Sequence, residues 1–163
     1  MEYQLAQVNI GLPVEPVTSA RLADFMALLD PINALADRAP GFVWRLQTED
    51  GDATAIRPFA DERLLINMSV WESVEALANF VYGTAHAAVM RRRREWFVPM
   101  REAYTAAWWI PAGTVPTPAE AEHRLAVLRA NGPTQESFTI QRSFPSPGNL
   151  DVPVRNDNWF CPA

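Results

Sequence analysis

The chain has 163 residues, a formal net charge of −5 and 48% hydrophobic residues, which indicates one globular domain and argues against nucleic acid as a partner. All 14 basic residues are arginines, so the chain has no lysine for Schiff-base or general-base chemistry. A single cysteine, Cys161, excludes an intrachain disulfide and a multi-cysteine metal site, and the lack of a long apolar run predicts a soluble, cytoplasmic protein without a membrane segment.

The first predicted element is a strand at residues 3–10, in which side chains alternate between two faces. Ala6, Val8 and Ile10 form an apolar face, whereas Asn9 lies on the more polar face. This alternation is typical of a strand with one face in a core.

The second predicted element is a helix, which follows a segment rich in proline. Thr18 or Ser19 can cap its start, because their side-chain oxygens accept hydrogen bonds from free backbone N–H groups. We expect Pro31 to bend or divide this helix and Pro40-Gly41 to end it.

Two strands, at 42–48 and 63–71, flank a turn and are expected to be antiparallel neighbours. Asn67 and Trp71 lie on the mixed face of the second of them. Ser73 then caps a helix that is interrupted at Gly83-Thr84 and restarts toward residue 97.

The remaining predicted elements are a strand at 103–110, a helix between Thr117 and Gly132, and a last strand at 137–144. The order strand, helix, strand, strand, helix, strand, with an added helix and strand, predicts an α+β fold. We expect a ferredoxin-like antiparallel sheet with helices on one face, formed by residues 1–147 as a single domain, and an extended or disordered tail at 148–163.

Four consecutive arginines lie at residues 91–94. Successive residues of an α-helix are about 100° apart, so the run spreads around the helix and does not form one basic stripe. Arg93 shares a face with His86, seven residues before it, and with Phe97, four residues after it; Met90 lies on the same face. The run indicates a solvated, salt-bridged surface, with Arg93 as the member that can meet an anionic or carbonyl group.

His86 lies among apolar neighbours on that face. A neutral imidazole there can act as a general base, a hydrogen-bond donor or a metal ligand, or it can be a hydrogen-bonded core residue. The other histidine, His123, lies on a different helix, and no HExxH or CxxC spacing occurs. We therefore predict no metal site.

The six tryptophans can serve packing, or several of them can line a cavity together with Asn9, Asn67 and His86. An aromatic pocket with a few convergent polar groups is the usual form of a small-molecule site. The candidate substrate-binding residues are Asn67, Tyr82, Met90, Arg93, Phe97, Trp44 and Trp108.

Four segments together resemble one family: YQLAQVNIG, PGFVWRLQ, MSVWESVEALANFVYGTAHAAVMRRRREWF and AAWWIPAGTVPTPAEAEHRLAVLRANGPTQESFTI. The resemblance is to the DUF3291 family and covers residues 3–147; that family is in turn similar to the dimeric α/β-barrel superfamily. It implies a homodimer, in which two ferredoxin-like protomers pair their sheets into a barrel and each keeps a pocket between helices and sheet.

The superfamily includes antibiotic-biosynthesis monooxygenases, which oxidise polycyclic aromatic compounds without metal or flavin, and relatives that bind haem. The resemblance implies catalytic roles for Asn9, as the group that polarises a phenol-derived or enolate oxygen, and for Trp71; His86 is the candidate base. We expect a small-molecule enzyme of monooxygenase type that acts on a hydrophobic, aromatic compound without a cofactor. Two alternatives stay open: a haem-binding or haem-oxidising protein with His86 as axial ligand, and a non-catalytic ligand-binding or interaction module.

Overall fold

A four-stranded antiparallel sheet forms the centre of the computed structural model, which describes residues 1–48, 51–52, 54 and 60–149. Its strands are β1 (Tyr3–Gly11), β2 (Phe42–Arg45), β3 (Leu65–Trp71) and β4 (Thr105–Pro111). Their order in the sheet is β2-β3-β1-β4. With helices between β1 and β2 and between β3 and β4, this order confirms the ferredoxin-like α+β class.

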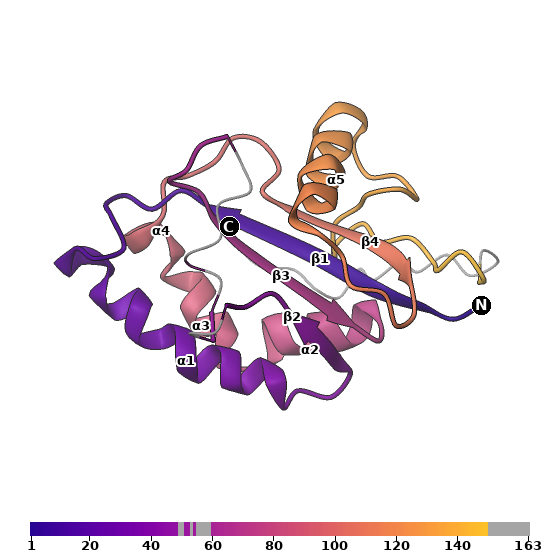
Figure 1. Ribbon diagram of the computed structural model, residues 1–163, viewed down its shortest axis with the longest axis horizontal. Helices are drawn as coiled ribbons and strands as arrows, with labels where there is room; N and C mark the ends of the chain where they lie inside the picture. The colour runs from indigo at the N-terminus through magenta and orange to yellow at the C-terminus, as the bar shows by residue number, and fades with distance from the viewer. Residues whose placement is uncertain (49–50, 53, 55–59, 150–163) are drawn as a thin grey trace.

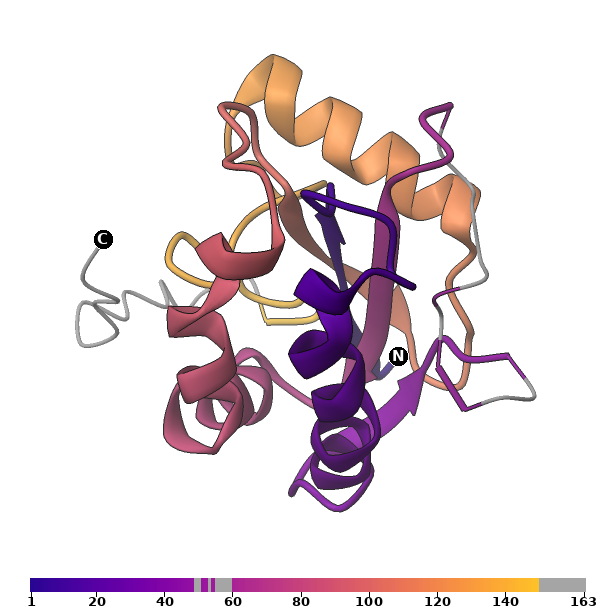
Figure 2. The ribbon, with the colours of Figure 1, turned by 90° about the vertical axis from the view of Figure 1, so that its left-hand side faces the viewer.

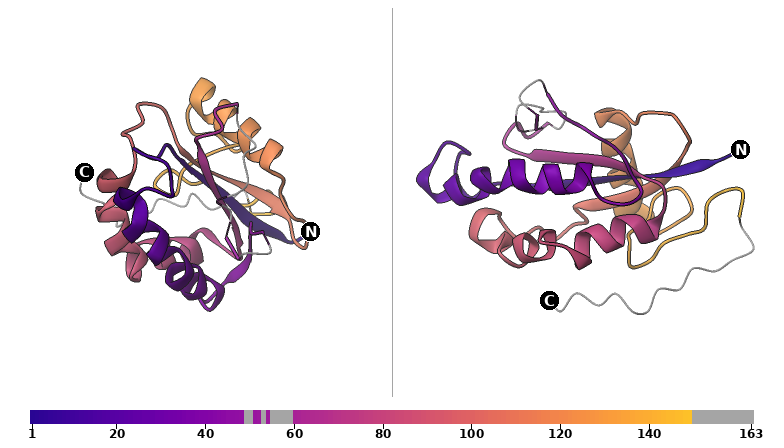
Figure 3. Two further views of the ribbon diagram at one scale, coloured as in Figure 1. Left: turned by 60° about the vertical axis from the view of Figure 1, so that its left-hand side comes forward. Right: turned by 90° about the horizontal axis from the view of Figure 1, so that it is seen from below.

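Helices cover both faces of this sheet, as Figures 1 and 2 show. The helices between β1 and β2 and between β3 and β4 lie on one face, and the added helix after β4 lies on the other, so the sheet lies between two helical layers (Figure 3). The expectation of helices on one face therefore holds for the ferredoxin-like unit and needs correction for the added helix. The helices are α1 (Ala23–Asp37), α2 (Val74–Gly83), α3 (His86–Arg91), α4 (Arg93–Trp96) and the added α5 (Pro118–Asn131).

Alternate residues of β1, β3 and β4 belong to two different cores, because strand side chains alternate between faces. The side chains on the face toward α5 are apolar and buried, and together with the α5 residues packed on them we call them the dry core. The opposite face packs partly against α1 and α2 and partly encloses a cavity. The dry core contains Ala6, Val8, Ile10, Ile66, Met68, Val70, Ala106, Trp108 and Ile110 from the sheet and Ala121, Leu125 and Leu128 from α5.

Two helix starts follow the sequence signals closely. Ser73 Oγ accepts a hydrogen bond from the backbone N–H of Ala76 at 3.1 Å, and Thr117 Oγ1 accepts one from Glu120 at 3.1 Å. Gly132 ends α5 with a φ of 71°, a left-handed value that glycine adopts without strain.

The first helix differs from its prediction at both Thr18/Ser19 and Pro31. Ser19 precedes a 3₁₀ turn at Ala20–Leu22, and its side chain makes no capping hydrogen bond. The helix α1 continues through Pro31 and ends at Asp37. Pro31 therefore removes one backbone donor from the middle of α1 without dividing it.

The arginine-rich helix is divided into α3 and α4 at Arg92, whose φ and ψ of −89° and 1° leave the helical region. The predicted last strand at 137–144 is wrong: it forms isolated bridges, from Phe138 to Ala107 of β4 and from Thr139 to Arg142. A turn closed by the Arg142 N–H on the Thr139 carbonyl reverses the chain before a strand can extend.

The tail predicted at 148–163 lies outside the described residues from residue 150 onward, together with Cys161. In the described part of the chain, the helices are too short or too polar to span a membrane. The homodimeric barrel stays a prediction.

Candidate functional site

A cavity of about 290 Å³ lies between the sheet and the layer of α1 to α4. Odd-numbered positions of β1, β3 and β4 form most of its floor, and the helices form its walls, so residues far apart in sequence meet there. Eight of the ten predicted site residues line it: Asn9, Asn67, Trp71, Tyr82, His86, Met90, Arg93 and Phe97.

Trp44 and Trp108 do not line this cavity. Both belong to the core on the opposite face of the sheet, where Trp108 is fully buried. Trp44 reaches that face because the pairing of β2 with β3 shifts register between Phe42 and Trp44. Without this irregularity, residues two apart would share a face; instead Phe42 lines the cavity and Trp44 does not.

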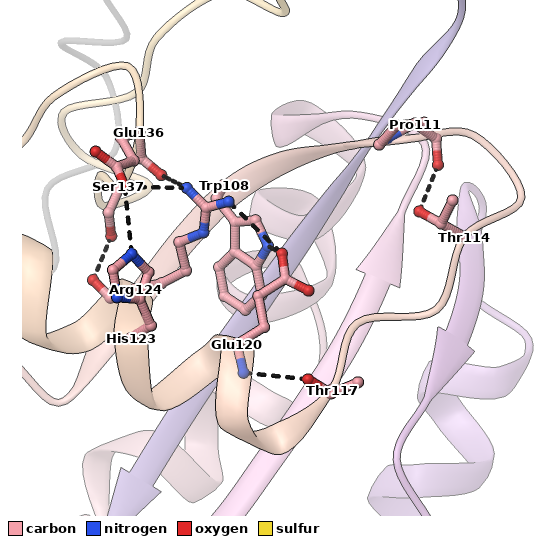
Figure 4. Close-up of polar contacts among 9 residues, drawn as sticks. All are labelled: Trp108, Pro111, Thr114, Thr117, Glu120, His123, Arg124, Glu136 and Ser137. Atoms are coloured by element: carbon pink, nitrogen blue, oxygen red, sulfur yellow. Dashed lines mark hydrogen bonds and ion pairs between the residues drawn. The ribbon is translucent and has the colours of Figure 1, made fainter.

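The surroundings of Trp108 explain its role beneath α5 (Figure 4). Its indole Nε1 donates a hydrogen bond to Glu120 Oε1 at 2.9 Å, so the buried N–H is satisfied. Arg124 lies 3.6 Å from Glu120 and donates to the Glu136 carbonyl at 2.8 Å. His123 lies 3.4 Å from the Glu136 carboxylate, on the surface and away from the cavity. This cluster joins α5 to the following segment, which is a structural role.

The floor of the cavity carries a network of polar side chains. Gln7 Nε2 donates hydrogen bonds to Asn67 Oδ1 at 3.1 Å and to Ser69 Oγ at 2.8 Å. Ser69 Oγ also accepts a hydrogen bond from the indole Nε1 of Trp71 at 2.8 Å. Asn9 lies opposite Asn67 in the strand register, and its carboxamide makes no side-chain hydrogen bond with another described residue. On the cavity floor, the Asn9 carboxamide is therefore unengaged among the described residues, whereas the neighbouring Asn67 carboxamide already accepts a hydrogen bond at its oxygen.

Trp71 belongs to an aromatic wall of the cavity, where it has a packing role. It is buried and stacks on Phe80, with ring centres 5.2 Å apart. It also makes an edge-to-face contact with Phe42, with ring centres 5.4 Å apart. The ring centre of Phe80 in turn lies 5.0 Å from that of His86. Since the Trp71 N–H is already bonded to Ser69, its contribution is shape and apolar surface.

His86 begins α3 and is half-buried in the cavity wall. Its Nδ1 lies 3.3 Å from the Val81 carbonyl oxygen, which can only accept. Nδ1 therefore carries the proton, and Nε2 keeps a lone pair. Burial lowers the pKa of His86 below its ordinary value of 6.5, although the bond to Val81 acts in the opposite direction. The imidazole is neutral at pH 7 and can accept a proton at Nε2.

Arg93 is the member of the run 91–94 that lines the cavity. Its Nη2 donates to the Ile10 carbonyl at 2.9 Å, and its Cζ lies 4.5 Å from the ring centre of Tyr104 and 4.9 Å from that of Phe97. In the described part of the chain, no carboxylate lies within 4.0 Å of this guanidinium. Burial lowers the pKa of Arg93 below its ordinary value, but the group stays cationic near neutral pH.

The other arginines of the run face outward. Arg92 forms ion pairs with Asp24 of α1 at 3.1 Å and with Glu95 at 2.9 Å. These carboxylates raise the pKa of Arg92 further. Arg91 and Arg94 are exposed. Arg92 therefore forms ion pairs outside the cavity while Arg93 lines it, because neighbouring residues of a helix point in different directions.

Gly11 allows Arg93 and Phe97 to approach the end of β1. A Cβ atom at this position would lie 2.6 Å from Phe97 Cδ1 and 3.4 Å from Arg93 Nη2. Any larger residue would push the ring and the guanidinium away from the strand.

The other predicted residues, Tyr82 and Met90, contribute to the walls. The Tyr82 hydroxyl accepts a hydrogen bond from Gln141 Nε2 at 2.7 Å, which connects α2 to the segment after α5. Among the residues that the structure describes, no three metal-ligating side chains come together. The sequence interpretation missed Gln7, Ser69 and Tyr104 as cavity residues; the alternation of β1 and β3 places Gln7 and Ser69 on the same face as Asn9 and was the available signal.

Comparison with known proteins gives one family match and several similar solved structures. The family model of a domain of unknown function, DUF3291, matches residues 4–154. No curated protein matches the chain.

The chain is similar to the solved structure of Rv0793 from Mycobacterium tuberculosis, with 17% identity, a TM-score of 0.46, and coverage of 70% of this chain and 99% of that one. It is also similar to SnoaB from Streptomyces nogalater, described as a cofactor-independent oxygenase, with 17% identity, a TM-score of 0.42, and coverage of 69% and 95%. NE2512 from Nitrosomonas europaea, of unknown function, has 16% identity, a TM-score of 0.44, and coverage of 71% and 95%.

Proposed function

Because the chain belongs to the DUF3291 family, as its sequence segments predicted, and that family has no assigned function, we propose one from the cavity itself. The protein is a small-molecule enzyme of monooxygenase type. Its substrate is a hydrophobic aromatic compound with an acidic C–H next to a carbonyl, or a phenol of equivalent acidity. The reaction uses dioxygen and needs no bound cofactor.

One observation carries this proposal: three polar groups with unused capacity line one aromatic cavity. His86 Nε2 has a lone pair, the Asn9 carboxamide has no described hydrogen-bond partner, and Arg93 has no described carboxylate within 4.0 Å. A base, a neutral donor and a cation within apolar walls are the groups that proton removal and stabilisation of the resulting oxyanion require.

In the proposed reaction, His86 Nε2 takes a proton from the acidic ring carbon, and the enolate oxygen that forms is held by Asn9 and Arg93. The electron-rich carbon then reduces dioxygen and forms a C–O bond. Cleavage of the O–O bond, with loss of the second hydrogen from that carbon, leaves a carbonyl and water. The overall change is R₂CH₂ + O₂ → R₂C=O + H₂O, in which the substrate supplies all four electrons.

The test uses anthrone, a planar tricyclic compound with an acidic CH₂ group. The wild-type protein should accelerate its conversion to anthraquinone, consume one O₂ per product, and incorporate one ¹⁸O atom from labelled dioxygen. His86→Ala and Arg93→Met should lower the rate roughly a hundredfold, whereas Arg94→Met, which changes an exposed arginine next to Arg93, should not. Anthrone binding with equal slow oxidation by all variants would instead favour the non-catalytic ligand-binding module.

Haem binding is a second candidate, favoured by the lone pair on His86 Nε2. A neutral imidazole in an apolar wall is a suitable axial ligand, and Arg93 is a suitable partner for a propionate. Haem would supply a redox-active iron to the cavity. Added haem should then show a Soret shift that His86→Ala abolishes; a spectrum identical to that of free haem would exclude this candidate.

A further inference from the structure

Gln7 is a cavity residue that the proposed reaction does not use. It is half-buried on β1 between Leu5 and Asn9, and both hydrogens of its amide nitrogen are engaged with β3, at Asn67 and Ser69. An amide group has two donor positions on nitrogen and acceptor positions on oxygen, so this engagement fixes which way Gln7 is turned.

The orientation of Gln7 decides the orientation of Asn67. Because Gln7 donates to Asn67 Oδ1, the oxygen side of the Asn67 carboxamide is taken, and its Nδ2 amino group is the side left for the cavity. Asn67 is exposed, so we infer that packing alone does not fix the orientation of its carboxamide. Without Gln7, its amide would be free to present either oxygen or nitrogen.

Ser69 holds Gln7 in turn from a buried position. Its hydroxyl oxygen accepts hydrogen bonds both from Gln7 and from the indole of Trp71, and Trp71 is fixed by Phe80 and Phe42. An indole nitrogen is a donor only, which makes the Ser69 oxygen an acceptor toward Trp71. The chain of contacts therefore runs from the aromatic wall to the exposed end of the cavity floor.

Asn9 and Asn67 are direct partners in the antiparallel register of β1 and β3. The Cβ atoms of such partners are about 5 Å apart, so two carboxamides at these positions can reach one oxygen atom of a ligand. Both amino groups then face that oxygen, provided that Asn67 keeps the orientation that Gln7 imposes.

We propose that Gln7 is a positioning residue, which turns the Asn67 amide so that Asn67 and Asn9 together donate hydrogen bonds to a carbonyl or enolate oxygen of the ligand. The site thereby selects ligands whose polar group at this position is an acceptor. This inference rests on the proposed function of the cavity, because it names the chemistry by which the same site recognises its substrate.

The test compares two tricyclic probes of nearly equal shape, fluorenone, which has a carbonyl oxygen, and fluorene, which has none. The measured quantity is the ratio of their dissociation constants, obtained from quenching of tryptophan fluorescence. The wild-type protein should bind fluorenone about tenfold more tightly than fluorene, since hydrogen bonds from neutral amides to a ligand carbonyl have about this effect. A residue that only supports the fold would alter both dissociation constants and leave the ratio unchanged.

Three variants separate the contributions. Gln7→Met removes both hydrogen bonds without adding charge, Gln7→Glu can only accept, and Asn67→Asp keeps an acceptor for Gln7 but loses its own donors. Each should lower the ratio severalfold toward one, because Asn9 then remains as the single carboxamide donor to the ligand oxygen. Gln4→Glu makes the same chemical change on the same strand outside the cavity, where Gln4 Oε1 accepts from the Gly113 N–H, and should keep the wild-type ratio.

The outcomes distinguish a failure of the inference about Gln7 from a failure of the proposed function of the cavity. If Gln7→Met or Gln7→Glu keeps the wild-type ratio, Gln7 does not orient Asn67 as a donor and the inference is overturned. A wild-type ratio near one also overturns it, while tight binding of both probes would leave the proposed function standing. If neither probe binds to the wild-type protein, the proposed function itself fails.

Discussion

The sheet face beneath α5 and the face over the cavity are built from alternate residues of the same strands, yet they have opposite properties. Val8, Met68 and Trp108 are inaccessible to solvent on the first face. Gln7 and Asn67, their neighbours in sequence, form a polar floor on the second. One face supplies the hydrophobic stabilisation of the sheet, and this allows the other to hold amide groups and a hollow space at modest cost.

The largest expected effect is on the dry face. Trp108→Ala should lower the free energy of unfolding by about 3–5 kcal/mol, because it removes a fully buried ring and leaves the Glu120 carboxylate without its indole donor. Urea unfolding measures this loss. At urea concentrations below the transition, probe binding in the cavity should match the wild type; a parallel loss of binding would show that the two faces are coupled.

Substitutions at two adjacent residues of β1, one on each face of the sheet, test the difference between the two faces. Val8→Asn should destabilise the fold by about 2–4 kcal/mol, since it buries a carboxamide among apolar side chains. Asn9→Val should change the free energy of unfolding by less than about 1 kcal/mol while lowering anthrone turnover roughly a hundredfold. Similar stability losses in both variants would contradict the assignment of the two faces.

Arg93→Met should act on ligand affinity more than on the fold. A carboxylate probe such as 2-naphthoate should bind about tenfold to a hundredfold more weakly to this variant, whereas the neutral 2-naphthamide should be little affected. Arg92→Met is the matched control, because Arg92 does not line the cavity and is paired with Asp24 and Glu95. Equal effects of the two substitutions on naphthoate would remove Arg93 from the site.

The smallest expected effect is a pH dependence from His86. Its pKa is lowered in the folded state by burial, so its contribution to stability is fully present above 6.5, the ordinary value, and is lost as the pH falls toward the folded pKa. The wild type should therefore lose more stability than His86→Gln on acidification below pH 6.5. Turnover should decline over the same acidic range as Nε2 becomes protonated. Parallel stability profiles for the two proteins would contradict a buried, neutral His86.

Much of the fold is readable from local patterns. Alternation in β1 and β3, the caps at Ser73 and Thr117 and the break at Gly83-Thr84 each act over a few residues, and each reappears in the structure. The last strand does not, because a turn after Thr139 leaves Phe138 as an isolated bridge to β4.

Site residues were predictable where the spacing along one helix brings them together. They were not predictable where the pairing of strands decides which face of the sheet a side chain occupies. Helical spacing brings together His86, Met90, Arg93 and Phe97, although the helix is divided at Arg92. Trp44 and Trp108 could not be assigned to a face from sequence alone. A register shift in β2 places Trp44, and the choice between Trp108 and its neighbour Trp109 depends on how β4 pairs with β1.

The strict pairing of β1 with β3 has a consequence for how this protein can change over evolution. A slip of one residue in β1 would turn Val8 toward the cavity and drive Gln7 and Asn9 into the dry core. Such a slip would remove the apolar contacts of β1 with α5 and the polar floor in the same step. Insertions or deletions within β1 should therefore be excluded by stability before any selection on activity, whereas single substitutions at its odd-numbered positions can alter ligand preference while the fold persists.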